Sequence, residues 1–240
     1  MINITGLSRG VFAVCAASFI WAAPVQATVV FSDNFDSGAS ADWGNERGTW
    51  RDTNGIYDAG APNNNPITYS SVTSQTSLTN FRVRVDVNDL DDGGIWLRSD
   101  FNGGPINGVL LVTGGNTGSS DALYWHTVQN GAFSPAQQFS SIPGLQDSDI
   151  ELTVDVIGDV YTAYIDGNPV PATSLTTALF ASGSVGLYDY SPTSGAGTPR
   201  GQTFDNFSIE TLSVPEPIST GVLAFGLVGL SLARKRRPRN

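Results

Sequence analysis

Alternation of apolar and polar residues is the dominant pattern between residues 28 and 213. In 81–87, FRVRVDV, phenylalanine and valine alternate with arginine and aspartate, which predicts a strand with one buried and one solvated face. Residues 150–158, IELTVDVIG, repeat the pattern. Residues 159–170 predict a strand, a tight turn at Asp166-Gly167 and a returning strand.

The same reasoning predicts eight further strands. They lie at 28–33, 48–52, 67–72, 94–99, 108–114, 122–128, 183–190 and 203–211. This part of the chain has no long stretch of helical period, and Gly, Asn, Ser and Thr separate short strands by turns. Ten or so strands in one domain predict an all-β fold, an antiparallel β-sandwich of the jelly-roll type.

The first 27 residues have the layout of a secretory signal peptide. Arg9 precedes an apolar run over 11–23, and small residues follow up to Thr28. We expect a signal peptidase to cut between Ala27 and Thr28. The single cysteine, Cys15, lies in this leader, so the mature chain would have no disulfide and no thiolate metal site.

The last 27 residues predict a membrane anchor. Residues 218–233 carry no charge and are long enough for a transmembrane helix in a thin bilayer. The basic residues that would stop translocation follow at once: Arg234, Lys235, Arg236, Arg237 and Arg239. We therefore expect a large exported domain over 28–213, an inner-membrane helix and a small cytoplasmic tail.

The order of features in 214–240 resembles a known sorting signal. Val214-Pro215-Glu216-Pro217, an apolar helix and an arginine-rich end resemble the PEP-CTERM signal of Gram-negative bacteria, also called the ice-binding protein C-terminal domain. The resemblance implies recognition by an exosortase and removal of the tail near Pro-Glu-Pro. It also implies transient anchoring in the inner membrane, followed by delivery to the cell surface or an extracellular polysaccharide matrix.

The middle of the chain resembles a concanavalin A-like, laminin-G-like sandwich. The segments that carry the likeness are FSDNFDSG near the start, VDVIGDVYTAYIDGNPV, and SGSVGLYDY with FDNFSIE near the end. In that fold the first and last strands are neighbours, which implies that residues 31–35 lie beside 204–209.

Charge argues against one class of partner. Without Arg9 and the five basic residues of the tail, the folded part has six bases, all arginine; without Glu216 it has 21 acids, which gives a net charge of −15. Such a surface repels phosphate backbones, so we expect no nucleic-acid partner.

The sequence offers little support for catalysis. Glycoside hydrolysis needs two carboxyl groups close together, and the Glu-x-Asp-x-x-Glu run of the glucanases in this superfamily is absent. Glu46, Glu151 and Glu210 are far apart in sequence. His126, the only histidine, lies in an aromatic strand, where it is either a structural polar residue or a general base.

Two acidic segments raise the question of calcium. Asp33, Asn34, Asp205 and Asn206 would put oxygen ligands on neighbouring strands, so a structural calcium ion is one reading and the capping of turns is the other. The segment NDLDDGG, residues 88–94, resembles part of a calcium loop but lacks its closing glutamate. For this segment we predict a solvated hairpin turn.

Aromatic residues give the remaining lead, because sugars stack on aromatic rings while polar neighbours bind their hydroxyl groups. Alternation in 94–99 would place Trp96 and Arg98 on one face and Ile95 and Leu97 on the other. The alternative is that large aromatics fill the core. The candidate ligand contacts are Trp96, Arg98, Trp125, Tyr188 and Asp189.

Together these patterns favour an exported, non-catalytic polysaccharide-binding protein of the cell surface or matrix. Two alternatives stay open: a hydrolase or lyase acting on glycosides through an atypical site, and a purely structural matrix protein.

Overall fold

The computed structural model describes residues 26–60, 68–101, 103–114, 121–190 and 202–213. All of these lie within one compact unit, residues 25–214. Most of the predicted signal peptide and the whole predicted sorting signal, residues 214–240, lie outside the described residues. Within the described ranges, no helix is long and apolar enough to cross a membrane.

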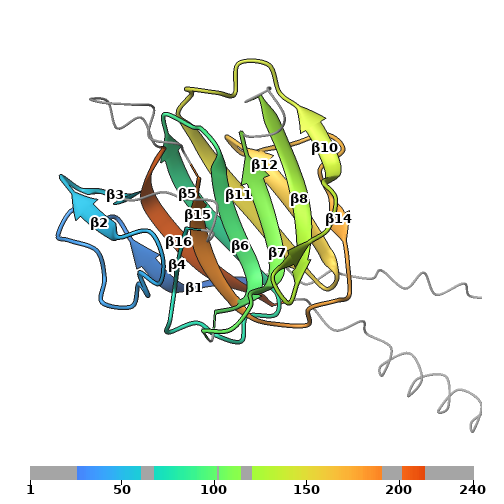
Figure 1. Ribbon diagram of the computed structural model, residues 1–240, viewed down its shortest axis with the longest axis horizontal. Helices are drawn as coiled ribbons and strands as arrows, with labels where there is room; N and C mark the ends of the chain where they lie inside the picture. Colours follow the sequence, from blue (N-terminus) through green and yellow to red (C-terminus); the bar gives the residue numbers. More distant parts are fainter. Residues whose placement is uncertain (1–25, 61–67, 102, 115–120, 191–201, 214–240) are drawn as a thin grey trace, which may run out of the picture. The chain divides into compact units, whose positions relative to one another are not determined.

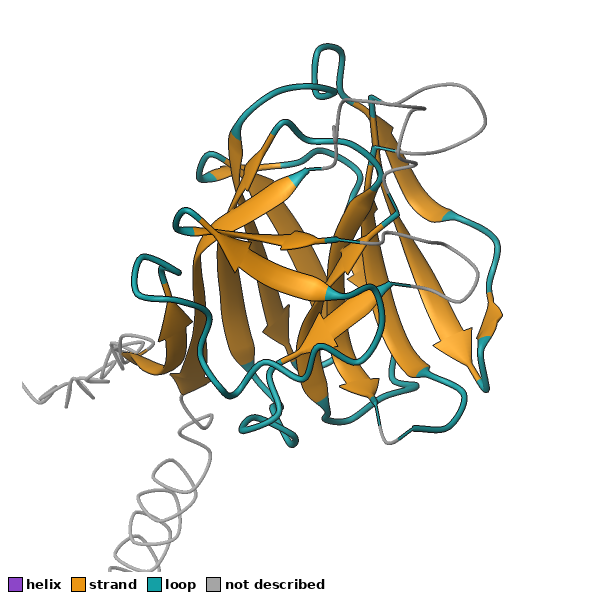
Figure 2. Cartoon of the chain, turned by 60° about the vertical axis from the view of Figure 1, so that its left-hand side comes forward, coloured by secondary structure: helices purple, strands orange, loops and turns teal. Residues whose placement is uncertain are grey.

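The described chain forms two antiparallel sheets that pack face to face, which confirms the predicted all-β sandwich (Figures 1 and 2). One sheet contains β1 (Gln26–Asp33), β2 (Trp50–Thr53), β3 (Ile56–Ala59), β5 (Phe81–Asn88), β11 (Ile150–Ile157), β12 (Val160–Ile165), β13 (Asn168–Pro169), β14 (Leu175–Thr176) and β16 (Thr203–Ser213). The order in this nine-stranded sheet is β13-β12-β11-β5-β16-β3-β2, with β1 on β16 and β14 on β12.

The second sheet has seven strands. They are β4 (Tyr69–Ser71), β6 (Gly93–Asp100), β7 (Asn107–Thr113), β8 (Ala122–Gln129), β9 (Ala132–Phe133), β10 (Gln137–Ser141) and β15 (Ser184–Asp189). Their order is β10-β8-β7-β6-β15-β4, with β9 on β8.

The first and last described strands are neighbours, as the family resemblance implied. Phe31 of β1 lies opposite Ile209 of β16, and Gln26 lies opposite Ser213. Both ends of the described domain therefore leave from the same point of the nine-stranded sheet.

The predicted alternation holds in the nine-stranded sheet. Along β5, residues 81, 83, 85 and 87 are buried and those between them are half-buried. These buried residues face a core shared with Ile95, Leu97, Leu111 and Trp125 of the other sheet. Burial of such apolar area is the main force that holds the two layers together.

The prediction of a hairpin at NDLDDGG is wrong. Strand β5 pairs with β11 and β16, whereas β6 pairs with β7 and β15, so the segment passes from one sheet to the other. Leu90, at its centre, is fully buried in the core between the sheets. The burial of this apolar residue draws the segment inward, and Asp91 and Asp92 become half-buried.

Candidate functional site

The outer face of the seven-stranded sheet carries a second apolar cluster, separate from the core between the sheets. Its buried members are Tyr69, Trp96, Ile106, Leu110, Val112, Ala122, Tyr124, Val128 and Tyr188. A sheet face that only met water would carry polar residues at these positions. The cluster therefore marks this face as the first place to look for a ligand.

A cavity of about 210 Å³ opens on this face, and we call it the aromatic hollow. Its lining consists of Asp92, Leu110, Val112, Tyr124, His126, Phe133 and Tyr188. Apolar walls with a few polar groups are typical of small-molecule sites.

Gly94 helps to form the aromatic hollow. Gly94 of β6 pairs with Tyr188 of β15 on one side and with Val112 of β7 on the other. No side chain therefore lies between Tyr188 and Val112 on this face of the sheet. A Cβ atom at this position would lie 1.9 Å from the Leu111 carbonyl oxygen, and the φ angle is +141°. Only glycine fits there without displacing the backbone of β7.

Asp92 supplies a carboxyl group with unusual protonation. Burial and, to a lesser extent, the nearby Asp91 carboxylate raise its pKa to about 7. Burial, and to a lesser extent the negative charge of Asp92, raises the pKa of Tyr124 to about 12. The same two causes raise the pKa of Tyr188. At neutral pH the aromatic hollow thus presents two phenol hydroxyl groups and a carboxyl group whose pKa lies near neutrality.

His126 adds a nitrogen to the same cavity. Its Nδ1 donates to the Ser134 carbonyl oxygen at 2.6 Å. Burial lowers the pKa of the imidazole, although this hydrogen bond opposes the shift. The neutral ring then has Nε2 as its acceptor.

Two exposed phenylalanines extend the aromatic surface toward the edge of the sheet. Phe133 is 39% exposed, and its ring lies 5.4 Å from the His126 ring. Phe139 of β10 is 45% exposed and stacks on Tyr124 at 6.1 Å. Exposed rings beside a cavity give a sugar a flat apolar surface on which to rest.

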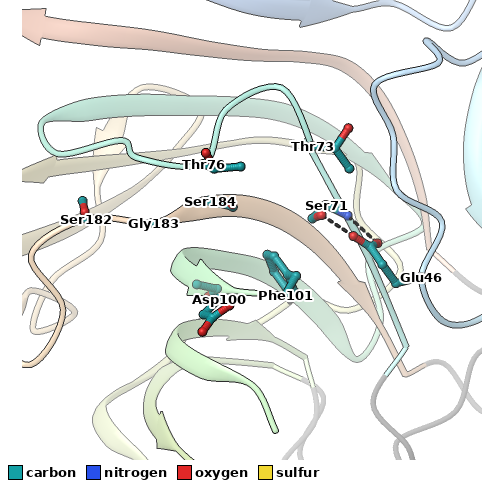
Figure 3. Close-up of a pocket in the computed structure, with 10 residues that line it drawn as sticks. Glu46, Ser71, Thr73, Thr76, Asp100, Phe101, Ser182, Gly183 and Ser184 are labelled. Atoms are coloured by element: carbon teal, nitrogen blue, oxygen red, sulfur yellow. Dashed lines mark hydrogen bonds between the residues drawn. The ribbon is translucent and has the colours of Figure 1, made fainter. Parts of the chain in front are cut away.

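A second cavity, of about 330 Å³, lies where β4, β6 and β15 meet, and we call it the polar hollow (Figure 3). Glu46, Asp100 and Phe101 line it together with Gly183. The rest of its lining consists of hydroxyl side chains: Ser71, Thr73, Thr76, Ser99, Ser182 and Ser184.

Among the described residues, Ser71 holds the Glu46 carboxylate in place. The Ser71 backbone N–H donates to Oε2 at 3.0 Å, and the Ser71 hydroxyl donates to Oε1 (Figure 3). Because both bonds come from β4, they tie the segment that carries Glu46 to the edge of the sheet and fix the direction of its carboxylate.

The predicted shared face of Trp96 and Arg98 is wrong. Trp96 lies in the outer cluster, but the register of β6 shifts between Leu97 and Asp100, and Arg98 has a φ of +46°. This bulge turns the guanidinium away from Trp96. A bulge of this kind reverses the facing that simple alternation predicts.

The guanidinium of Arg98 is buried and structural. It donates to the carbonyl oxygens of Thr79, Gly158 and Phe180 and lies 5.4 Å from the Tyr161 ring centroid. These contacts join several loops at one end of the sandwich.

Trp96 has a different environment from Trp125 on the other side of the same sheet. Both side chains are fully buried. The Trp125 Nε1–H donates to the Thr173 carbonyl oxygen at 2.7 Å within the core, whereas the Trp96 Nε1–H has no acceptor among the described residues. An unpaired buried donor is uncommon, and an ordered water or a ligand hydroxyl could satisfy it.

The other two candidates for ligand contact adjoin each other on β15. Tyr188 lines the aromatic hollow, and Asp189 is buried beside it. Of the five predicted contacts, Tyr188 lines one of the two hollows described above.

The candidate calcium residues make protein contacts. The Asp33 carboxylate accepts hydrogen bonds from the backbone N–H groups of Phe35 and Ser40 and from the Trp43 indole. Asn206 donates to Asp86 at 2.8 Å, and Asp205 accepts from the Asn206 backbone. Among the residues that the structure describes, no group of three or more His, Cys, Asp or Glu side chains could hold a metal ion. The contacts of Asp33 favour the turn-capping reading over the calcium reading.

Sequence reasoning did not connect Asp92, Val112, Phe133 and the polar hollow with a site. One signal was present: the segments GVLLVT and ALYW lack alternation, so their strands are apolar on both faces. The residues that complete each hollow come from strands far apart in the sequence, and local patterns do not reveal that proximity.

The fold is shared with known proteins, although the sequence has no match. No protein-family model matches the chain, and no curated protein is similar to it in sequence. A carbohydrate-binding module, CBM66, from Bacillus subtilis aligns with a TM-score of 0.54 and 20% identity over 71% of this chain and 96% of its own.

Two other solved structures align in the same way. A Bacillus subtilis protein of unknown function with a galectin-like fold has a TM-score of 0.55 and 9% identity, over 80% of this chain and 100% of its own. The CBM2 module of the evolved Dit protein of Lactobacillus casei BL23 phage J-1 has a TM-score of 0.52 and 14% identity, over 81% and 100%. These likenesses establish a common β-sandwich fold.

Proposed function

We propose that the protein binds a polysaccharide, without cleaving it, through the outer face of the seven-stranded sheet. The observation that carries this proposal is the aromatic hollow, where apolar and aromatic walls surround a carboxyl group, two phenols and an imidazole. A sugar ring has the complementary chemistry, since its C–H faces are apolar and its rim carries hydroxyl groups. Two of the solved structures with this fold are carbohydrate-binding modules, which agrees with the proposal.

The predicted terminal segments supply the place where this binding occurs. A signal peptide over 1–27 and a PEP-CTERM tail from Val214 imply export, processing by signal peptidase and an exosortase, and release to the surface or matrix. Because Thr28 pairs with Thr211 in the described domain, a cut before Thr28 would keep most of β1 in its sheet. Sequencing the termini of the protein recovered outside the cell tests this route; a full-length chain in the cytosol would contradict it.

Substitution of the exposed ring at the hollow tests the binding function. The Phe133→Ala variant removes a wall of the hollow from a side chain that is already 39% exposed, so the fold should be preserved. We expect the affinity for a glycan selected on an array to fall at least tenfold, which corresponds to about 1.4 kcal/mol.

The matched control is Val160→Ala. Val160 is 41% exposed and lies on the other sheet. It should bind with unchanged affinity. If Phe133→Ala and Val160→Ala bound the glycan with equal affinity, the binding site would lie outside the aromatic hollow. If the wild-type protein bound no glycan, a purely structural matrix protein would be favoured.

A glycoside-acting enzyme is the second candidate, because the same hollow contains a possible acid and base. Asp92, with a pKa of about 7, can donate a proton at neutral pH, and neutral His126 can accept one. Release of reducing or unsaturated ends from matrix polysaccharide, lost in Asp92→Asn and His126→Ala, would support catalysis. Binding without any release of ends would support the first proposal.

A further inference from the structure

The polar hollow and the aromatic hollow lie along the same strand. Ser184 of β15 lines the first, and Tyr188 of the same strand lines the second. The two residues are four positions apart on an extended strand, a distance of about 13 Å. Val185 and Leu187, between them, face the core, so Ser184 and Tyr188 share the outer face of the sheet.

Phe101 joins the two hollows. It lines the polar hollow, and its ring stacks on Tyr69 at 4.8 Å and lies edge-on to Trp96 at 6.3 Å. Gly186 lies beneath it: a Cβ there would approach the Phe101 ring to 3.1 Å and the Ser70 carbonyl oxygen to 2.9 Å. The half-buried Phe101 ring therefore lies against the buried rings of Tyr69 and Trp96 between the hollows, and Gly186 leaves room for it to pack against the sheet.

Charge in the two hollows has one sign. Asp92 lines the aromatic hollow, Glu46 and Asp100 line the polar one, and the described residues of the two linings include no arginine or lysine. Three arginines of the described chain instead pair with carboxylates on the nine-stranded sheet: Arg51, Arg82 and Arg84. The Arg47 guanidinium lies 6.0 Å from the Tyr69 ring centroid but is in neither lining. A sulfate or uronate group inside either hollow would therefore meet carboxyl groups of like charge.

We propose that the polar hollow is a second sugar-binding site, and that the two hollows together hold an internal stretch of a polysaccharide whose sugars are neutral or carry amino groups. This proposal rests on the proposed function. The aromatic hollow binds one sugar by its apolar face. The hydroxyls and the fixed Glu46 carboxylate of the polar hollow bind the hydroxyl or ammonium groups of another, with Phe101 below the chain between them.

Chain length is the first arm of the test. Fragments of two to about eight sugars are prepared from a neutral glucan, from chitosan and from polygalacturonate, and their affinities for the full-length protein are measured by calorimetry. Two linked sites give a large gain in affinity once a ligand spans both. We expect affinity for the neutral or the amino series to rise at least tenfold between fragments too short and long enough to reach both hollows, and no binding of the acidic series.

A variant that fills the polar hollow is the second arm. Thr76 is exposed and lines this hollow, so Thr76→Arg brings a long side chain toward Glu46 and Asp100 with little effect on folding. Long fragments should then bind at least tenfold more weakly, while short fragments keep their affinity. Thr176→Arg is the matched control, because Thr176 is exposed on β14 of the other sheet.

The outcomes separate this inference from the proposed function. Suppose that the affinity falls in Phe133→Ala but does not rise with fragment length and does not change in Thr76→Arg. This result would overturn the second site and leave the aromatic hollow as the binding site. Preferred binding of polygalacturonate fragments would overturn the selection against acidic sugars. If no series and no glycan on an array bound the wild-type protein, the proposed function would fail together with this inference.

Discussion

The outer faces of the two sheets differ although the strands beneath them belong to one sandwich. On the nine-stranded sheet, polar residues alternate with core residues, and ion pairs such as Arg82–Asp155 and Arg84–Glu210 cross the strands. On the seven-stranded sheet, β6 is buried at seven consecutive positions, and aromatic rings replace the ions. One face is built to meet water and the other to meet something less polar. The loss of alternation is what distinguishes them in the sequence.

A buried charge gives the largest expected difference between the faces. Leu110 is 2% exposed in the outer cluster, so Leu110→Asp should lower the free energy of unfolding by about 3–5 kcal/mol. Ser208→Asp, half-buried opposite Arg84 on the other sheet, should change it by no more than about 0.5 kcal/mol. Urea unfolding measures both. A small change in the free energy of unfolding in Leu110→Asp would mean that this face is exposed to water.

Asp92 should make stability depend on pH. Its folded pKa of about 7 exceeds the unfolded value of 3.8, so its contribution is fully present below about pH 4 and is lost as the pH rises through 7. Asparagine does not ionise, so the Asp92→Asn variant lacks this pH-dependent loss of stability. The free energy of unfolding of the variant minus that of the wild type should therefore rise by about 4 kcal/mol between about pH 4 and about pH 8.5. Urea unfolding at the two pH values tests this. The same stability difference at both would contradict the raised pKa.

The ion pair on the nine-stranded sheet should give a smaller effect. The Arg82 guanidinium donates two hydrogen bonds to Asp155, at 2.5 and 2.6 Å, at a partly buried position. A double-mutant cycle with Arg82→Met and Asp155→Asn should give a coupling energy of roughly 1–2 kcal/mol. Glycan affinity should not change, because the pair lies on the opposite layer. A loss of affinity in these variants would mean that the two faces are coupled.

Calcium should have the smallest effect. Both oxygens of the Asp33 carboxylate already accept N–H donors, so we expect the melting temperature to be the same with calcium and with a chelator. A resident ion at 100 times its dissociation constant would add about 2.7 kcal/mol. A clear rise in melting temperature with calcium would restore the metal site that the sequence suggested at Asp33 and Asn206.

Most of the fold was predictable because strand alternation is a local property. The alternation in β5 and β11 and the Asp166-Gly167 turn could be read directly from the sequence, and the pairing of β1 with β16 followed from the family resemblance. The bulge at Arg98 and the crossing at Leu90 were missed, since each depends on contacts with distant segments. Short β3, with Asp58 inside it, has too little pattern to identify.

The site was less predictable than the fold. Tyr188 was identified because it is an aromatic residue beside an acid, but its partners Val112 and Phe133 reach the same cavity through strand order alone. Gly94 and Gly186 contribute by having no side chain, and their importance depends on the neighbours that the fold supplies.

The indole N–H signals of the tryptophans test the central claim most directly. Among the described tryptophans, Trp43, Trp50 and Trp125 donate their indole N–H to protein oxygens. The Trp96 indole, which lies opposite Gly186 between Ser184 and Tyr188, has no acceptor in the described part of the chain. In a ¹H–¹⁵N spectrum of the full-length protein titrated with its glycan, the Trp96 signal should shift while those three stay fixed. A titration that moved Trp43 or Trp50 and left Trp96 unchanged would contradict binding on the seven-stranded sheet.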